Sequence, residues 1–436
     1  MKPVTIGLLG LGTVGGGTIQ VLKRNAAEIT RRAGREIRVG VASSRNLERA
    51  RPFDLEGIRL VADPYRVVTD PEVDIVVELI GGIEPAKELV MRALDAGKHV
   101  VTANKMLIAL HGNEIFAKAQ ERGLMVAFEA AVAGGIPIIK ALREGLAGNQ
   151  VEWLAGIING TCNFILTEMR EKGRDFADVL REAQALGYAE ADPAFDVGGI
   201  DAAHKLTILA SIAFGIPLQF DKVSTTGITD IEAVDVAYAE ALGYRVKLLG
   251  IARRSPTGIE LRVHPTLIPE RRLIANVNGV MNAVVVKGDA VGPTLFYGAG
   301  AGAEPTASSV VADLVDVTRA LTADPENRVP HLAFQPSAIA DIPVLPVDAI
   351  NTAYYLRLCA EDKPGVLADV TRILADQDIS IEALLQKEAR VGETRLPIIL
   401  LTQTVLEKDM DRAIRQLEAL DTIHGKIKRI RVESLG

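Results

Sequence analysis

A glycine-rich turn near the start of the chain limits the choice of fold more than any other feature. The apolar run Val4–Leu9 predicts a short strand, and the residues GGTIQVLKRNAAEI after the turn predict a helix. A Gly-x-Gly-x-x-Gly turn in this setting is typical of dinucleotide-binding α/β domains, because glycines let the backbone approach a pyrophosphate at the helix N-terminus. An ordinary strand-to-helix turn is the alternative. The predicted cofactor contacts are Gly10, Gly12, Thr13, Val14 and Gly15.

The end of the second predicted strand, IRVGVASS, bears on the choice of cofactor. Domains selective for NAD usually carry an acid there, which holds the ribose 2′-hydroxyl. This chain has Ser43, Ser44 and Arg45 instead. Because no acid would repel a 2′-phosphate and Arg45 could pair with it, the sequence favours NADP over NAD.

Two further apolar strands continue the alternation of strands and helices. The run VDIVVELI precedes a helix that stops at Gly97, and HVVTANK then brings Asn104 and Lys105 to the end of the next strand. Ligands of open α/β sheets bind at the carboxyl ends of the strands, so Lys105 is a candidate site residue. A surface lysine is the alternative at this position.

A charged segment in the middle of the chain, GYAEADPAFDVGGIDAAHK, lies before a long apolar helix. It contains Glu190, Asp196 and Asp201, followed by Lys205 four residues after Asp201. Asp201 and Lys205 therefore share one face of a helical turn, which would also fit a plain salt bridge. Their neighbours are Ala and Leu, so these charges would be costly to bury without a partner or a function.

The last part of the chain predicts a separate small unit. Residues 325–346 contain five prolines and little periodicity, which is typical of a linker. After them the strand and helix patterns follow the order βαββαβ of a ferredoxin-like fold. We expect this tail to fold by itself and to be removable without opening the rest of the protein.

Composition excludes several classes of protein. The 436 residues exceed what one core usually holds, so two or three domains are expected. A net charge of −7 without a basic cluster argues against nucleic acid as the main partner. No apolar run reaches membrane-spanning length, and the N-terminus lacks a signal-peptide layout. With only Cys162 and Cys359, the chain suits a reducing compartment, and we expect a cytoplasmic protein.

Proton transfer is the chemistry that the charged residues could perform. Neither cysteine lies near a suitably spaced histidine pair, so the sequence does not predict a zinc site. Hydride transfer between a nicotinamide and an alcohol needs a group that moves the hydroxyl proton, and lysines remain as candidates. Lys105 and Lys205 would come from different domains and face each other, which would lower both pKa values.

The charged segment resembles the signature of homoserine dehydrogenases, in which Gly, Asp-Pro, Asp, Gly, Asp and Lys occur at these spacings. The glycine turn, the Ala-Asn-Lys sequence at Lys105 and the tail extend the resemblance over nearly the whole chain. It implies NADP- or NAD-dependent interconversion of L-homoserine and L-aspartate 4-semialdehyde, in threonine, methionine and isoleucine biosynthesis. The implied architecture comprises a Rossmann dinucleotide-binding domain, an α+β catalytic domain and a ferredoxin-like ACT domain. The expected boundaries are 1–135 with a returning helix 304–323, then 136–303, a linker 324–351, and 352–436.

The resemblance also implies residue roles. Lys205 would donate or accept the hydroxyl proton and Lys105 would assist or polarise the oxygen, while also contacting the cofactor. Glu190 and Asp201 would bind the substrate ammonium, and Asp196 would bind substrate or orient a lysine. Gly187, Glu190 and Gly302 would lie near the cofactor. The bend after LMVAFEA would bind Na⁺ or K⁺ at Glu129, Val132, Gly134 and Ile136, mostly through carbonyl oxygens.

The tail resembles ACT domains, which bind amino acids as regulatory modules. Its turn EDKPGVL would let Gly365 bring a ligand carboxylate to a helix N-terminus. Threonine is the expected effector, and we expect a homodimer or homotetramer. No kinase-like segment precedes the glycine turn, so a monofunctional enzyme is expected. A dimerisation domain without a ligand is the alternative for the tail.

Two other functions remain open from the sequence. A phosphorylating semialdehyde dehydrogenase would use Cys162 as a thioester nucleophile, although the apolar run around Cys162 suggests a buried structural residue. A non-catalytic amino-acid sensor would keep the fold and the tail, but it would not need a pair of lysines.

Overall fold

A computed structural model of the protein describes residues 2–48, 51–324, 328–386 and 394–435. These residues form two compact units, each made of three chain segments. The first unit comprises residues 1–160, 201–223 and 281–342, and the second comprises 161–200, 224–280 and 343–436. Within the described ranges, no helix is both long and apolar enough to cross a membrane.

The first unit contains a six-stranded parallel sheet with the order β3-β2-β1-β4-β5-β6. This is the strand order of the Rossmann fold, whose ligands bind where the order reverses, beside β1 and β4. The expected dinucleotide-binding fold is therefore confirmed. The strands are β1 (Val4–Leu9), β2 (Ile37–Ser43), β3 (Arg59–Val61), β4 (Ile75–Glu78), β5 (His99–Thr102) and β6 (Val126–Ala127).

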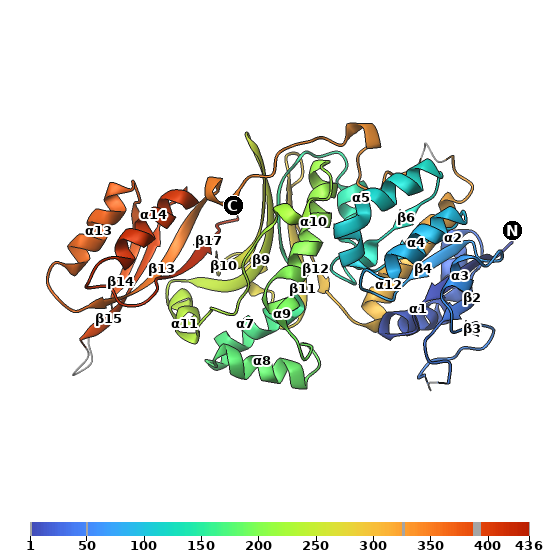
Figure 1. Ribbon diagram of the computed structural model, residues 1–436, viewed down its shortest axis with the longest axis horizontal. Coiled ribbons are helices and arrows are strands. Elements are labelled where there is room, and N and C mark those ends of the chain that lie inside the picture. Colours follow the sequence, from blue (N-terminus) through green and yellow to red (C-terminus); the bar gives the residue numbers. More distant parts are fainter. Residues whose placement is uncertain (1, 49–50, 325–327, 387–393, 436) are drawn as a thin grey trace. The chain divides into compact units, whose positions relative to one another are not determined.

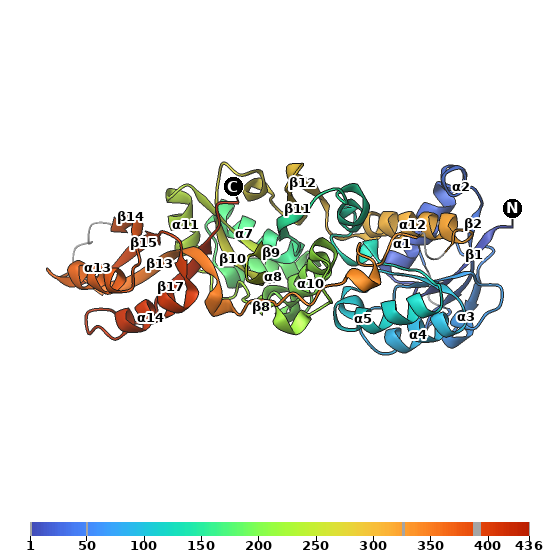
Figure 2. The same ribbon diagram turned by 90° about the horizontal axis from the view of Figure 1, so that it is seen from above.

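Helices cover both faces of this sheet, which explains its continuous apolar strands. One face carries α1 (Thr13–Arg24), α2 (Ala26–Ala33) and α12 (Ala303–Ala320), and the other carries α3 (Tyr65–Val68), α4 (Ala86–Asp95) and α5 (Lys105–Glu121) (Figure 2). Although α12 is remote in sequence, its apolar side shares the core of β1 and α1. It begins next to α1, where the Ala303 carbonyl leaves no room for a side chain at Gly17.

The first unit also holds three strands that pair antiparallel, β7 (Val151–Ile157), β11 (Met281–Gly288) and β12 (Gly292–Ala299). The sequence did not predict β12, because its glycines and half-exposed pattern resemble a loop. The expected strand after Leu124 is also shorter than predicted. It ends at Ala127, and the single turns η1 (Glu129–Ala131), α6 (Ile138–Lys140) and η2 (Ala141–Gly145) follow. The buried helix α10 (Ile200–Phe214) and the turn η3 (Phe220–Lys222) complete this part.

The second unit contains the tail, which forms the ferredoxin-like sheet order β17-β13-β15-β14. Helices α13 and α14 cover one face of this sheet (Figure 1). The expected hairpin turn at residues 390–393 lies outside the described residues. The tail elements are β13 (Asn351–Glu361), α13 (Val366–Asp376), β14 (Ile381–Gln386), β15 (Arg395–Thr402), β16 (Val405–Leu406), α14 (Glu407–Glu418) and β17 (Lys428–Val432).

The remaining elements of the second unit precede the tail in the chain. A long antiparallel hairpin joins β9 to β10, and β8 adds a short parallel pairing to β10. These elements are α7 (Gly160–Lys172), α8 (Phe176–Ala185), α9 (Ala194–Val197), β8 (Ser224–Thr225), α11 (Ala233–Ala241), β9 (Tyr244–Ser255) and β10 (Gly258–Pro269).

The tail, which we expect to be removable, shares strand pairing and buried ion pairs with the rest of the second unit. Strand β17 pairs with β10 in parallel, which joins the tail sheet to the β9–β10 hairpin. The fully buried Arg262 of β10 forms an ion pair with Glu433 after β17, at 2.6 Å. Burial favours the neutral acid, yet Arg262 and Arg253 hold the pKa of Glu433 below its ordinary value. Removing the tail would therefore leave a buried guanidinium short of a partner.

A second buried contact ties the tail to α11. Asp235, which is 1% exposed, accepts hydrogen bonds from Arg357 Nε at 2.6 Å and from the Tyr355 hydroxyl at 3.0 Å. Arg357 and Tyr355 belong to β13, whereas Asp235 lies in the first turn of α11. The tail and α11 therefore share one buried charge cluster.

Replacing Asp235 tests the buried contact between the tail and α11. Asp235→Ala leaves the buried Tyr355 hydroxyl without its acceptor and the half-buried Arg357 with Glu232 alone, so the free energy of unfolding should fall by roughly 3 kcal/mol. The exposed pair of Asp178 and Arg181 provides the control, since Asp178→Ala should cost about 1 kcal/mol or less. Chemical denaturation of both variants measures the difference. Equal losses in the two variants would show that the tail is not anchored through Asp235.

Candidate functional site

Asp201, at the start of α10, is the centre of a buried charge cluster in the first unit. The residue is 3% exposed, and its two carboxylate oxygens receive different lysines. Lys105 Nζ lies 2.9 Å from Oδ1, and Lys205 Nζ lies 2.7 Å from Oδ2. The structure thus brings together the two lysines predicted from the sequence, with a carboxylate between them.

The electrostatics of this cluster favour an ionised Asp201. Burial alone would raise the pKa of the carboxyl group, but Lys205 and Lys105 outweigh burial and hold the pKa well below its usual range. A carboxylate that is fixed between two ammonium groups offsets their mutual repulsion. Direct opposition of the two lysines, as expected from the sequence, is therefore replaced by a bridged arrangement.

The end of β7 completes the support of the cluster. The Asn159 side-chain amide donates to Asp201 Oδ2 at 2.8 Å, and the Ile158 carbonyl accepts from Lys205 Nζ at 2.7 Å. Asn159 is 4% exposed, so this amide is a buried orienting group. The hydrogen bond of Asn159 helps to hold the Asp201 carboxylate in place.

Lys105 is fixed by a polar network at the ends of β4 and β5. Lys105 is the first residue of α5, and Asn104 caps that helix by accepting from the Leu107 N–H at 3.1 Å. The fully buried Glu78 accepts from the Thr102 hydroxyl at 2.7 Å, and the same hydroxyl accepts from the Asn104 N–H. This chain of hydrogen bonds determines where α5, and with it Lys105, begins.

Glu78 was missed by sequence analysis, although a signal was present. It is the one acid of strand β4, whose other residues are Ile75, Val76 and Val77. Its carboxylate also accepts the backbone N–H groups of Ile80 and Gly81, which shapes the turn after β4. An acid at the carboxyl end of a buried parallel strand should therefore be taken as a candidate site residue.

The glycine turn lies at the same edge of the sheet, because β1, β4 and β5 are parallel neighbours. Gly10 has φ +99°, and a side chain there would meet the Leu79 carbonyl at 2.9 Å. A side chain at Gly15 would meet the Gly10 carbonyl at 2.2 Å, so the turn requires both glycines. Gly12 faces open space and caps α1 without a side-chain hydrogen bond. The first backbone N–H groups of α1, including those of Thr13 and Val14, can therefore donate hydrogen bonds to a pyrophosphate.

The other predicted cofactor residues of this unit lie near this edge. Ser43 ends β2 beside β1, and the exposed Arg45 follows it. A further arginine, Arg51, donates to the Ser44 hydroxyl at 2.7 Å, so two cations follow this strand. Gly302, with φ +127°, caps α12 without a side-chain hydrogen bond, next to the packed start of α1.

The predicted cation loop is buried and held tightly. Ala133 and Gly134 both have positive φ, and the Gly134 carbonyl accepts from the Ser309 hydroxyl at 2.6 Å. The Glu129 carboxylate accepts two backbone N–H groups, from Ile139 and Lys140. Burial, together with Asp313, raises the pKa of Glu129 to about 7. Its side chain therefore acts in holding the loop, and a cation would depend on the carbonyls.

Three of the four carbonyls expected to bind the cation already have protein partners. The Gly134 carbonyl accepts from the Ser309 hydroxyl, the Ile136 carbonyl accepts the Ile138 N–H at 2.8 Å, and the Glu129 carbonyl accepts the Val132 N–H at 3.4 Å. Val132 and Ile136 are buried at 0% and 2% exposure, so a cation here would be shielded from water. In the described part of the chain, no group of three or more His, Cys, Asp or Glu side chains could hold a metal.

The other predicted residues belong to the second unit. Gly187, with φ +75°, follows α8, and the exposed Glu190 lies beyond it. Asp196 is half-buried on the short helix α9, and its backbone carbonyl accepts the Cys162 thiol at 3.3 Å. Cys162 is fully buried, which fits a structural residue. Gly365, with φ +96°, begins α13 without a side-chain cap.

His204, the neighbour of Lys205, is a buried packing residue. Its ring stacks on Phe220 with the centroids 4.2 Å apart. Burial lowers the pKa of His204 to about 4, so the ring is neutral near pH 7. The cluster around Asp201 therefore relies on lysines for its positive charge.

A Rossmann sheet with an open glycine turn, and a pair of lysines held by a buried aspartate at the same edge, define a nicotinamide-dependent oxidoreductase. Comparison with known protein families supports this class of protein. Residues 10–129 match the family described as homoserine dehydrogenase, NAD binding domain, and residues 137–315 match homoserine dehydrogenase. Residues 354–422 match the ACT domain. The chain belongs to the homoserine dehydrogenase family.

Individual relatives support this assignment over the full length. The chain is 66% identical to the homoserine dehydrogenase of Pseudomonas aeruginosa, covering 100% of both chains, and 41% identical to that of Corynebacterium glutamicum, covering 99% and 96%. A crystal structure of a homoserine dehydrogenase from Thiobacillus denitrificans has 69% identity and a TM-score of 0.95, covering 100% and 99%. A hyperthermophilic archaeal homoserine dehydrogenase in complex with NADPH has 27% identity and a TM-score of 0.62, covering 73% of this chain and 98% of its own.

Neutralising Asp201 tests the bridged arrangement. Asp201→Asn keeps the size of the side chain but leaves two ammonium groups close together without their carboxylate. The free energy of unfolding should fall by roughly 3–5 kcal/mol, as for other buried ion pairs that lose one partner. Asp192→Asn, at an exposed position in the same segment, is the matched control and should change stability little. Denaturant titration measures the free energy of unfolding of both variants. An unchanged value for Asp201→Asn would show that Asp201 does not stabilise the two lysines as a bridging carboxylate.

Proposed function

We propose that the protein interconverts L-homoserine and L-aspartate 4-semialdehyde with NADP or NAD. The observation that carries the proposal is the cluster of Lys105, Lys205 and Asp201 in the same unit as the open glycine turn. Membership of the homoserine dehydrogenase family supplies the substrate. The pathway would be the biosynthesis of threonine, methionine and isoleucine, in the cytoplasm.

In this proposal the two lysines have different tasks. Lys205 Nζ, as the neutral amine, takes the proton of the homoserine hydroxyl during oxidation, and as the ammonium it returns that proton to the aldehyde oxygen during reduction. Lys105 Nζ, whose side chain is 35% exposed, polarises that oxygen and contacts the cofactor. When bound, the nicotinamide accepts or supplies the hydride. Asp201, held by Asn159, keeps both lysine side chains in place.

The substrate's ammonium group needs negative partners. Glu190 and Asp196 remain the proposed contacts, and Glu190 is exposed and accessible. Asp201 was expected to share this task, but both of its oxygens already hold lysines. We therefore assign substrate binding to Glu190 and Asp196, and assign the positioning of the lysines to Asp201. Gly187 is proposed to lie against the cofactor.

For the cofactor we favour NADP. Gly10, Gly12, Thr13, Val14 and Gly15 would hold the pyrophosphate, and Gly302 would border it. Arg45 is exposed after β2 and would bind the 2′-phosphate. A monovalent cation, Na⁺ or K⁺, would bind the carbonyls of Glu129, Val132, Gly134 and Ile136, which belong to a buried loop.

Regulation is proposed to act through the tail. Threonine would bind at Gly365, where the N-terminus of α13 is open, in a homodimer or homotetramer. The buried contacts of Asp235 and Arg262 provide a route by which such binding could influence β10 and α11.

The two alternative functions have less support. Cys162 is fully buried and donates its thiol to a backbone carbonyl, whereas a thioester nucleophile needs access to substrate. A sensor without catalysis leaves the buried pair of lysines unexplained.

Kinetics of two variants test the proposal. Purified protein should reduce NADP, and less effectively NAD, when L-homoserine is added. Lys205→Ala should lower kcat by about 10²–10⁴-fold, the usual contribution of an acid–base group, while circular dichroism stays native. Cys162→Ser is the control and should keep most of its activity. Loss of activity in folded Cys162→Ser with a fully active Lys205→Ala would favour the thioester mechanism instead.

A further inference from the structure

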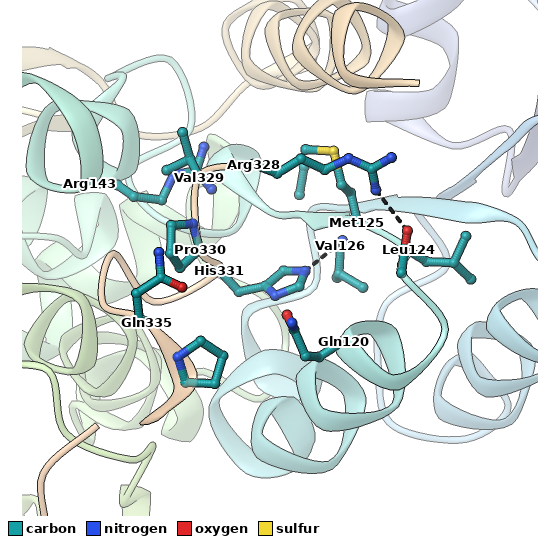
Figure 3. A pocket seen from close by; sticks show the side chains of 13 residues that line it. Gln120, Leu124, Met125, Val126, Arg143, Arg328, Val329, Pro330, His331 and Gln335 are labelled. Carbon is teal, nitrogen blue, oxygen red and sulfur yellow. Dashed lines mark hydrogen bonds between the residues drawn. The ribbon is translucent and has the colours of Figure 1, made fainter. Parts of the chain in front are cut away.

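A cavity of about 270 Å³ lies away from the lysine cluster, beside the edge strand β6. The chain segment that follows α12 forms one wall of it, and α5 and η2 contribute others (Figure 3). Five polar side chains line the cavity, namely Gln120, Arg143, Arg328, His331 and Gln335. Neither the predicted site residues nor the proposed function uses this cavity.

The hydrogen bond of His331 fixes which of its nitrogens carries the proton. The backbone N–H of Val126 donates to Nε2 at 3.1 Å, so Nε2 must be an acceptor. Burial, together with Arg143, lowers the pKa of His331 to about 4, so the ring is neutral near pH 7. A neutral imidazole that accepts at Nε2 carries its proton on Nδ1. His331 therefore offers an N–H donor at Nδ1, which has no acceptor among the described residues.

Arg143 contributes a second donor and a buried positive charge. Its side chain is only 9% exposed, and its Nη2 pairs with the exposed Glu144 at 3.0 Å. Its buried Nε–H finds no acceptor within the described ranges. This N–H is therefore available to donate to a ligand in the cavity.

Arg328 adds positive charge to the cavity, and its hydrogen bonds hold the chain segment that follows α12 in place. It donates from Nη1 to the Gly123 carbonyl at 2.7 Å and from Nη2 to the Ala323 carbonyl at 3.1 Å. These acceptors are neutral, so the charge of Arg328 is not compensated by them. The described lining of the cavity includes no aspartate or glutamate. Two guanidinium groups, an imidazole N–H and two side-chain amides thus suit a negatively charged, accepting ligand.

An apolar cavity of about 630 Å³ adjoins this polar one and shares Gln120, Pro330, His331 and Pro336 with it. Its other walls include Phe116, Phe334 and Ile339. The Phe116 ring stacks on His331 with centroids 5.0 Å apart, so the polar and apolar parts meet at His331. A bare inorganic anion would leave this apolar part unused.

We propose that the two cavities together bind a small organic carboxylate with an apolar body. The carboxylate accepts from Arg143 and from Nδ1 of His331, and the apolar body lies toward Phe116 and Phe334. Gln120 and Gln335, at the rim, interact with any further polar group of the ligand. The site belongs wholly to the first unit and involves neither the lysine cluster nor the tail.

Calorimetric titration of the full-length protein with benzoate tests the proposal, with acetate and inorganic phosphate compared at equal ionic strength. Benzoate should bind saturably at one site per chain, at least about tenfold more tightly than acetate or phosphate. Arg143→Gln should weaken benzoate binding by roughly 10–100-fold, because it removes a charged hydrogen bond. Arg122→Gln, at an exposed pair with Asp95 outside the cavity, is the matched control and should bind as the wild type does.

A second variant separates binding from folding. Phe334→Ala, at a half-exposed position of the apolar wall, should weaken benzoate but leave acetate unchanged. Three outcomes would overturn the proposal: absence of saturable benzoate binding to the wild type, equal affinity for phosphate and benzoate, or unchanged benzoate affinity in folded Arg143→Gln and Phe334→Ala.

Discussion

The buried carboxylate of Asp201 is the interaction on which the arrangement of the site depends. Two lysines from distant parts of the chain could not remain close together in a buried place without a negative charge between them. Asp201 supplies that charge, and its own position is set by α10 and by the Asn159 amide. The site is therefore a pair of lysines organised by one acid, rather than two independent bases.

Buried hydrogen bonds at the end of the Rossmann sheet also determine the position of Lys105. The parallel strands β4 and β5 end side by side, which places Glu78 and Thr102 in contact. Their hydrogen bonds, with the Asn104 cap, fix the first residue of α5. Fold and site are linked through this polar network, because a shift of either strand end would move Lys105 relative to Asp201.

Local patterns in the sequence were sufficient to predict the Rossmann and ferredoxin-like folds. The turn at Gly10 combines a short-range steric requirement with a strand and a helix, and such signals are readable without tertiary information. Strand β12 could not be recognised, because its glycines and exposed positions resemble a loop and only its pairing with β11 makes it a strand. The contact between the tail and β10 could not be predicted from the sequence for a related reason. Ion pairs such as Arg262 with Glu433 connect residues that no local pattern relates.

The candidate site was only partly predictable. Lys105, Asp201 and Lys205 could be selected by charge, position and family resemblance, but their mutual geometry depends on contacts between segments about 100 residues apart in the chain. The bridging position of Asp201, and the orienting task of Asn159, emerge only when β7 and α10 are placed together. The cavity near His331 is a feature of packing, and the sequence alone gave no sign of it.

A double-mutant cycle on the two lysines tests the central claim most directly. If Lys105 and Lys205 act as one unit through Asp201, their effects on kcat should be strongly non-additive. The variant that carries both Lys105→Met and Lys205→Met should then lose little more than the worse of the single variants. Steady-state kinetics with L-homoserine and NADP on the four proteins gives the result. A double variant whose loss equals the product of the two single losses would show that the lysines act independently, and would contradict this account of the site.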